Sequence, residues 1–186
     1  MTAPLAFAIA VIVLLFAPGP TNAVLATAGA EAGRRSVLPL LAAELTAYLL
    51  SVSVSRLVLL PLIEIYPIAS TIVKLVVAVY LLTAGWRLWK SRPSPGATLI
   101  GWRQVFVTTA LNPKGLLLAI GIFPQDDPLL PFYFAGFAVA VIVSGLTWFA
   151  AGRLLARLAG RRADVLPKVG AGVLFGFAAY LAGTAA

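Results

Sequence analysis

The sequence predicts an all-α membrane protein with six transmembrane helices, arranged as two inverted halves of three helices each. The chain of 186 residues is 61% hydrophobic and only 11% charged, with a mean hydropathy of +1.01. A soluble domain of this length cannot bury so much apolar surface. The apolar residues form repeated stretches of about 20 residues, the length that crosses a bilayer. We therefore expect one transmembrane domain, residues 1–186, and no soluble domain.

Short connections separate the expected spans. The spans cover residues 3–27, 37–60, 68–89, 105–123, 130–152 and 169–183. A polar cytoplasmic linker, residues 91–102, separates a first half, residues 1–90, from a second half, residues 103–186. Each half contains an odd number of spans, so the second half would enter the membrane inverted, as in transporters built from inverted repeats.

The first span is interrupted near its middle. Pro18, Gly19 and Pro20 end an apolar half-helix, because proline lacks a backbone donor and clashes with the preceding turn. Thr21 and Asn22 are expected to cap the half-helix that follows, whose free N–H groups would lie near the break. A simple proline kink is the alternative, but Pro-Gly-Pro followed by two capping residues favours a functional break.

The second span contains a carboxyl group far from both ends. Glu44 lies about 10 Å along the axis from residue 37, at a rise of 1.5 Å per residue. An ionisable side chain at that depth is a candidate for a functional site. The alternatives are that Glu44 is protonated or that it reaches a wide cytoplasmic vestibule. Arg56 lies about one turn from the far end of the span and is expected to extend toward the interface.

The third span follows a tight turn that we expect at residues 60–67. Lys74 lies in the outer third of this span, and Tyr80 lies deeper. Trp86 and Trp89 close the span as an anchor at the membrane interface.

The fourth span repeats the pattern of a break beside polar side chains. Asn112 and Pro113 interrupt its apolar run, and Lys114 follows directly. Lys114 lies about 11 residues beyond Arg103 and hence near mid-membrane, where a charged lysine costs at least ~2.5 kcal/mol unless it is paired or hydrated. Glu44 lies at comparable depth and is its expected partner. A purely structural salt bridge is the alternative to a role in transport.

The last two spans carry small residues suited to close helix packing. In the fifth span these residues are Gly136, Ser144, Gly145 and Thr147. In the sixth they are Gly170, Gly172 and Gly176. The sixth span has no ionisable side chain and is expected to be a packing helix.

The distribution of charge predicts the orientation. Eleven basic residues lie around the connections after the first, third and fifth spans: Arg34, Arg35, Arg87, Lys90, Arg92, Arg103, Arg153, Arg157, Arg161, Arg162 and Lys168. The other connections carry Glu64, Asp126 and Asp127 instead. The positive-inside rule places the basic connections in the cytoplasm and both termini outside. This bias accounts for the net charge of +8, which therefore does not indicate a nucleic-acid partner.

The chain contains no cysteine and no histidine. This excludes thiol redox chemistry, haem attachment, cysteine or histidine metal sites and a His-dependent triad. We expect no cofactor, no metal site and no enzymatic activity. An intramembrane enzyme would have to rely on Glu44 or Lys114 alone, and no acid–base pair at motif spacing supports that alternative.

The two breaks together predict a site for a zwitterion. Such a ligand needs N–H groups or a cation for its carboxylate, and carbonyls or a carboxylate for its ammonium. The breaks and the polar side chains beside them supply both kinds of partner. The predicted substrate-binding residues are Pro18, Gly19, Pro20, Asn22, Glu44, Asn112, Pro113 and Lys114.

Several motifs resemble the lysine exporter superfamily, the LysE/RhtB-type amino acid translocators. They are Pro18-Gly19-Pro20, Gly33-x-Arg35, Lys74 with Tyr80-Leu81 and Gly85, Asn112-Pro113-Lys114 and Phe123-Pro124-Gln125. The resemblance implies a multi-pass exporter of amino acids or their derivatives in the bacterial inner membrane, driven by the proton motive force and forming a homodimer. Its partners would be the lipid bilayer and a small-molecule substrate. The alternative is a passive channel or a non-transporting membrane protein on the same fold.

Overall fold

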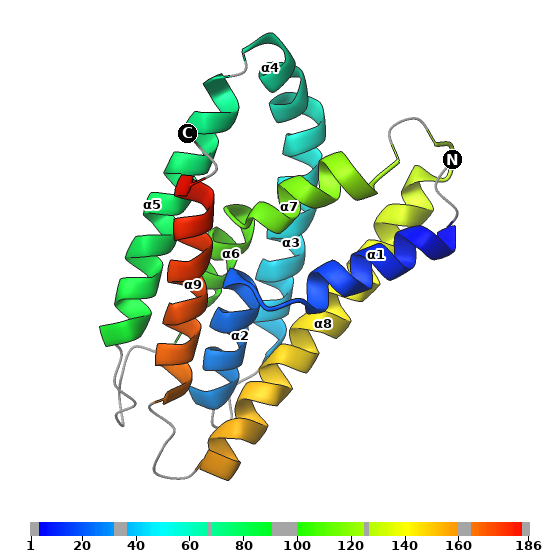
Figure 1. The fold of residues 1–186 in the computed structure, drawn as a ribbon. Helices are drawn as coiled ribbons and strands as arrows, with labels where there is room; N and C mark the ends of the chain where they lie inside the picture. The colour runs from blue at the N-terminus through cyan, green and yellow to red at the C-terminus, as the bar shows by residue number, and fades with distance from the viewer. Residues whose placement is uncertain are drawn as a thin grey trace.

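The computed structural model describes residues 4–31, 37–66, 68–90, 100–124, 127–159 and 165–183. These residues form helices joined by short connections, and no β-strand occurs among them (Figure 1). The predicted all-α class is confirmed. Most of the predicted linker, residues 91–99, lies outside the described residues, as do residues 32–36, 125–126 and 160–164.

The helices follow the predicted spans closely, and two of the spans are divided. In chain order the helices are α1 (Pro4–Phe16), α2 (Pro20–Glu31), α3 (Leu38–Val54), the short π-helix η1 (Ser55–Leu59), α4 (Leu60–Ile65), α5 (Ile68–Lys90), α6 (Trp102–Ala110), α7 (Pro113–Leu117), the short π-helix η2 (Leu118–Ile122), α8 (Leu130–Ala159) and α9 (Val165–Gly183). The predicted interruptions of the first and fourth spans are both present, between α1 and α2 and between α6 and α7.

Three helices are long and apolar enough to cross a membrane. They cover Leu38–Ile65, Ile68–Lys90 and Leu130–Leu158. Helices α1 and α2 qualify as a fourth span if they are taken together, although they are bent by 57° at the break. The apolar part of α9 is shorter, and the break divides α6 from α7. The chain therefore has the character of a membrane protein with three to four candidate spans.

The surface of the molecule supports the same conclusion. Large apolar side chains point outward along most helices, for example Leu5 on α1, Leu57 on η1 and Phe132 on α8, each more than 70% exposed. The polar and charged side chains that are buried lie inside the bundle instead. A distribution of this kind suits a hydrocarbon surrounding, because water would make the exposed apolar area unfavourable.

The helices run alternately between two ends of the molecule (Figure 1). The C-terminal ends of α2, α5 and α8 lie at one end, and α4 and the C-terminal end of α9 lie at the other. Helix α5 packs along α9, and α2 packs along α8. Helices α2 and α8 approach at backbone distance, because a Cβ added to Gly29 would meet the backbone of Phe149, and one added to Gly152 would meet Ala26. The second half of the broken first span is therefore packed closely against α8.

Several sequence-based boundaries need correction. Residues 60–65 were expected in a tight turn, but they continue the helix as α4. Pro61 lies directly after the π-helix η1; it has no N–H to continue the regular hydrogen-bond pattern, and π-helical turns and prolines are the usual places where a continuous helix departs from that pattern. Helix α8 continues past residue 152 to Ala159, so Arg153 and Arg157 lie on the helix and not in a connection.

The small residues of the last two helices do not all serve packing. A Cβ added at Gly170 would meet Leu88 at 2.9 Å, so this glycine does allow close approach to α5. At Gly172, Gly176 and Gly136 an added Cβ would meet nothing within 4 Å. The prediction from the sequence that these three glycines allow close helix packing is therefore wrong.

Candidate functional site

The two helix breaks meet inside the bundle and are joined by hydrogen bonds. Thr21, in the first turn of α2, donates to Oγ1 of Thr109 near the end of α6 at 3.1 Å. Asn112, between α6 and α7, donates through Nδ2 to Thr21 Oγ1 at 2.9 Å and to the hydroxyl of Tyr48 on α3 at 3.3 Å. Tyr48, Thr21 and Thr109 are completely buried. Three helical segments are therefore held together by one polar cluster.

Asn22 has a different role from the predicted one. It was expected to cap α2, but its Nδ2 group donates to the carbonyl oxygens of Leu15 and Ala17, both at 2.8 Å. Helix α2 already begins at Pro20, and Gly19 O accepts the first helical hydrogen bond from Ala23 N. Asn22 therefore satisfies carbonyl groups that the end of α1 leaves without helical partners.

Asn112 caps the second half of the other broken helix. Its backbone is extended, and its Oδ1 accepts a hydrogen bond from the backbone N–H of Lys114 at 3.1 Å. Pro113 is the first residue of α7, where proline fits without losing a hydrogen bond. The local sequence thus accounts for the break: Asn112 supplies the cap and Pro113 prevents the helix from continuing through it.

Lys114 reaches from the second break into the first. Its Nζ atom donates a hydrogen bond to the carbonyl oxygen of Ala17, and only 2% of the side chain is exposed. The end of the side chain lies over Gly19, where an added Cβ would be 2.8 Å from Cε and 2.9 Å from Nζ of Lys114. The ammonium therefore lies at the carboxyl end of α1, which carries the negative end of the helix dipole.

Glu44 lies on α3 against α8, with 1% of its surface exposed. A Cβ added at Gly145 would meet the carboxylate, so this glycine makes the space for it. The Oε2 atom of Glu44 is buried and has no hydrogen-bond partner. A buried carboxylate oxygen without a donor is unusual in native proteins and calls for an explanation.

The expected direct pair between Glu44 and Lys114 is not present. The two side chains lie near enough for their charges to interact, yet within the described part of the chain no hydrogen bond or ion pair joins them. The carbonyl of Ala17 takes the place of the carboxylate as the partner of the ammonium. The oxygen of Glu44 that has no partner and the ammonium of Lys114 are thus separate groups in one cluster.

The remaining predicted site residues shape the cluster through the backbone. Gly19 and Pro20 are buried at the break, whereas the side chain of Pro18 is exposed. Pro113 is half-buried. The prolines therefore leave carbonyl groups without helical partners and do not themselves contact a ligand through polar atoms.

Sequence reasoning missed several members of the cluster. Tyr48 lies four residues after Glu44 and hence on the same face of α3, a signal that the sequence does contain. Ser144 was assigned to packing, but its hydroxyl donates to Leu15 O at 3.1 Å. Thr108 is also buried, and its Oγ1 lies 2.8 Å from the hydroxyl of Tyr80 on α5. Threonine and serine in apolar helices are so common that their position alone does not mark a site.

No protein-family model, curated protein or solved structure matches the chain. The likeness to the lysine exporter superfamily therefore stays an interpretation of the motifs.

Proposed function

We propose that the chain is a transporter that exports amino acids or their derivatives across the bacterial inner membrane, coupled to the proton motive force. The observation that carries this proposal is the contact between the ammonium of Lys114 and the carbonyl of Ala17 at the broken end of α1. The ammonium held there, inside an apolar bundle, is that of the protein's own lysine side chain. The α-ammonium of an amino acid has the same chemistry as the side-chain ammonium of lysine.

The neighbouring groups suit the rest of such a substrate. The substrate's ammonium would replace that of Lys114 as the donor to the carbonyl of Ala17. The side chain of Lys114 would then be available to bind the substrate's carboxylate. The free Oε2 of Glu44 supplies a further acceptor for the ammonium. Irregular backbone at membrane depth is tolerated only inside protein or beside a water-filled cavity, and in transporters such breaks form the substrate site.

The proposal includes six spans in two inverted halves. In that arrangement α1 and α2 correspond to α6, α7 and η2, α3 to α8, and α5 to α9. Part of the packing supports such a twofold relation: α3 contacts α8, α5 contacts α9, and the contact of α1 with α8 is matched by that of α6 with α3. The contact of α2 with α9 has no comparable counterpart between α7 and α5. The basic ends of α5 and α8 would face the cytoplasm, with both termini outside. In line with the resemblance, we expect a homodimer.

The burial of the site favours a coupled transporter over a passive channel. Thr21, Asn22, Glu44, Asn112 and Lys114 are each 3% exposed or less. A site closed to both ends is one state of an alternating-access cycle, whereas a channel needs an open path. Glu44 and Lys114 are the charged side chains among the buried described residues, and they are the groups expected to exchange protons.

An efflux assay tests the proposal. Cells that express the chain should resist at least one member of a panel of toxic amino acid analogues, and a preloaded substrate should leave faster than in cells without it. An uncoupler should abolish this efflux. Lys114→Met should abolish it as well, while the matched control Lys74→Met, at a half-buried position on α5 outside the buried cluster, should retain it.

Two results would count against the proposal. Efflux that an uncoupler leaves unchanged would favour the passive channel. Equal efflux from Lys114→Met and Lys74→Met would remove Lys114 from the mechanism.

A further inference from the structure

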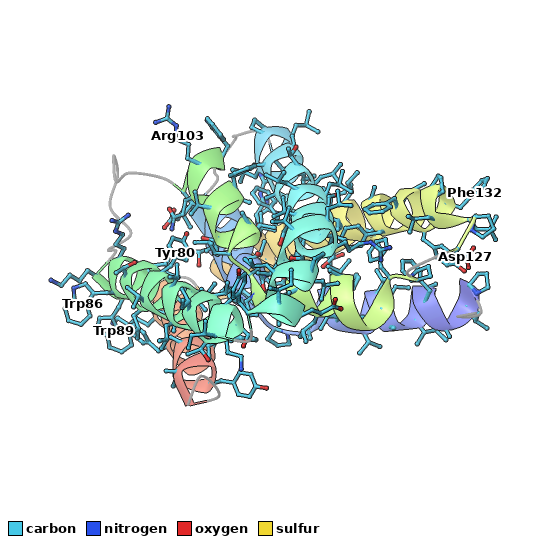
Figure 2. All side chains as sticks on the ribbon, turned by 90° about the horizontal axis from the view of Figure 1, so that it is seen from above. Tyr80, Trp86, Trp89, Arg103, Asp127 and Phe132 are labelled. Carbon is cyan, nitrogen blue, oxygen red and sulfur yellow. The ribbon has the colours of Figure 1, made fainter. Side chains whose placement is uncertain are left out.

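A cavity with charged side chains in its walls lies outside the buried cluster, between α5 and α6 beside the end of α2. Its volume is about 860 Å³, which lies within the usual range of small-molecule sites. Charged side chains line it from three helices: Glu31, Arg87, Lys90 and Arg103. In the view from above, Tyr80 lies between α5 and α6, with Arg103 and Trp86 farther out on the same side of the molecule (Figure 2).

The carboxylate of Glu31 is only partly satisfied. It accepts a hydrogen bond from the backbone N–H of Ile100. Its Oε2 atom is buried and has no hydrogen-bond partner. A buried carboxylate oxygen requires a donor, so the cavity contains a vacant acceptor for an N–H group such as a primary ammonium.

The cations of the cavity lie on the other walls. Lys90 is 4.7 Å from the centre of the Trp86 ring, and Arg103 is 5.4 Å from that of Trp102. Across the described part of the chain, no ion pair joins Glu31 to Arg87, Lys90 or Arg103. The opposite charges therefore face a common space and do not neutralise each other by contact. This arrangement fits a ligand that carries both charges.

The inner wall of the cavity leads to the buried cluster. Tyr80 lines the cavity, and its hydroxyl is hydrogen-bonded to Thr108 at 2.8 Å. Thr108 is fully buried and is followed by Thr109, which accepts the hydrogen bond from Thr21. One tyrosine–threonine contact thus separates the cavity from the cluster that contains Lys114.

We propose that this cavity is a second binding site, which takes a small zwitterion with an apolar side chain before that ligand reaches the buried cluster. The ammonium of the ligand binds Glu31, and its carboxylate binds Arg87 and Arg103. Its side chain lies against apolar wall residues such as Ala84 and Val107. The order of the two sites rests on the proposed export function, whereas binding at the cavity does not.

The absence of cysteine from the chain allows a direct binding assay. Thr83 lines the cavity and is exposed, so a Thr83→Cys variant in phosphatidylcholine vesicles can be modified by neutral methyl methanethiosulfonate. The rate is measured with L-leucine, with 4-methylpentanoate, which lacks the ammonium, and with 3-methylbutylamine, which lacks the carboxylate. Leucine should slow modification, and each analogue should need a roughly tenfold higher concentration, because one charge-assisted hydrogen bond contributes about that factor in affinity.

Charge variants identify the groups that bind. In the Thr83→Cys background, Glu31→Gln and Arg103→Gln should each raise the leucine concentration needed for protection roughly tenfold. Arg157→Gln is the matched control, because Arg157 is exposed near the end of α8 and does not line the cavity. The modification rate without ligand, compared among the variants, reports whether each one keeps the cavity intact.

The outcomes separate this site from the export function. Protection that persists in Lys114→Met, where export should be lost, supports a second site. The proposal is overturned if leucine does not protect Thr83→Cys itself. It is also overturned if leucine protects Glu31→Gln and Arg103→Gln as well as it protects Arg157→Gln. Both conclusions hold even where efflux is normal. If phosphatidylethanolamine in the vesicles protects and leucine does not, the cavity binds a lipid headgroup and the proposal is likewise overturned. Normal protection without any efflux would instead overturn the export function alone.

Discussion

Lys114 and Gly19 fit against each other across the two helix breaks, with Cε of the lysine 2.8 Å from the position that a glycine Cβ would occupy. The glycine permits the ammonium to reach the end of α1. Any side chain at residue 19 would push the lysine away from the carbonyl of Ala17. This relation connects a residue of the first half of the chain to one of the second and is the basis of the first prediction.

Gly19→Ala should reduce export while the protein level in the membrane stays normal. The added methyl group meets the flexible end of the Lys114 side chain, which can move without disturbing the backbone. Efflux and membrane abundance are measured together, with Gly172→Ala as the control because an added Cβ there meets nothing within 4 Å. Normal efflux from Gly19→Ala would show that the position of the ammonium at Ala17 is not needed.

Gly145→Ala should reduce both export and thermal stability in detergent. The methyl group would meet the Glu44 carboxylate and the side chain of Leu41, both of which are tightly enclosed between α3 and α8. Overpacking of this kind costs typically about 1–3 kcal/mol. Gly136→Ala on the same helix is the control, since its Cβ would lie in open space. Equal melting temperatures for the two variants would contradict the packing described for Glu44.

Lys114→Met and Glu44→Gln should have largely independent effects on stability. The two side chains interact only at a distance, since Lys114 donates to Ala17 and Oε2 of Glu44 has no partner. Breaking a direct buried ion pair by removing one partner costs roughly 3–5 kcal/mol, and the double variant would then recover much of that loss. We expect little recovery in a double-mutant cycle measured by thermal unfolding. Strong recovery of stability in the double variant would indicate a direct pair.

Asn22→Asp should destabilise the protein more than Asn22→Ala. The amide of Asn22 donates to two carbonyl oxygens, of Leu15 and Ala17. Alanine removes these donors but leaves Leu15 O its hydrogen bond from Ser144 and Ala17 O its hydrogen bond from Lys114, so the cost should be about 1 kcal/mol. A carboxylate would in addition turn negative oxygens toward the carbonyls. Thermal unfolding of the two variants in detergent gives the order. A more stable Asn22→Asp variant would contradict the assigned orientation of the amide.

Single cysteines test the orientation of the chain. Cysteines introduced at Ser94 and Gly160 should be protected from an impermeant thiol reagent in intact cells, and one at Asp127 should be labelled, because the positive-inside rule predicts that the basic connections face the cytoplasm. Labelling after permeabilisation is the control for accessibility. The reverse pattern would place both termini in the cytoplasm.

The helical membrane class and the positions of both interruptions follow from the amino-acid sequence alone. Mean hydropathy and the length of apolar stretches are properties of the chain alone. The backbone consequence of Pro20 and Pro113 is equally local, since proline cannot donate within a helix in any tertiary context. For that reason the breaks lie where the sequence predicts them, and Asn112 caps α7 as its type and position suggest.

Which side chains and carbonyl groups contact each other at those breaks depends on how the helices pack. The positions of Glu44 and Lys114 within their spans predict a similar depth in the membrane, but they do not predict which groups the two side chains contact. In the structure the ammonium of Lys114 donates to the carbonyl of Ala17. The N–H groups of Asn22 face α1 and not α2 because the bend brings the unpaired carbonyls of α1 back over its side chain. Gly145 makes room for Glu44 only because α8 packs on α3. Whether two groups form a hydrogen bond depends on differences of a few tenths of an ångström in the distance between their atoms. Here those atoms belong to segments far apart in the chain, so no local sequence pattern specifies the partners.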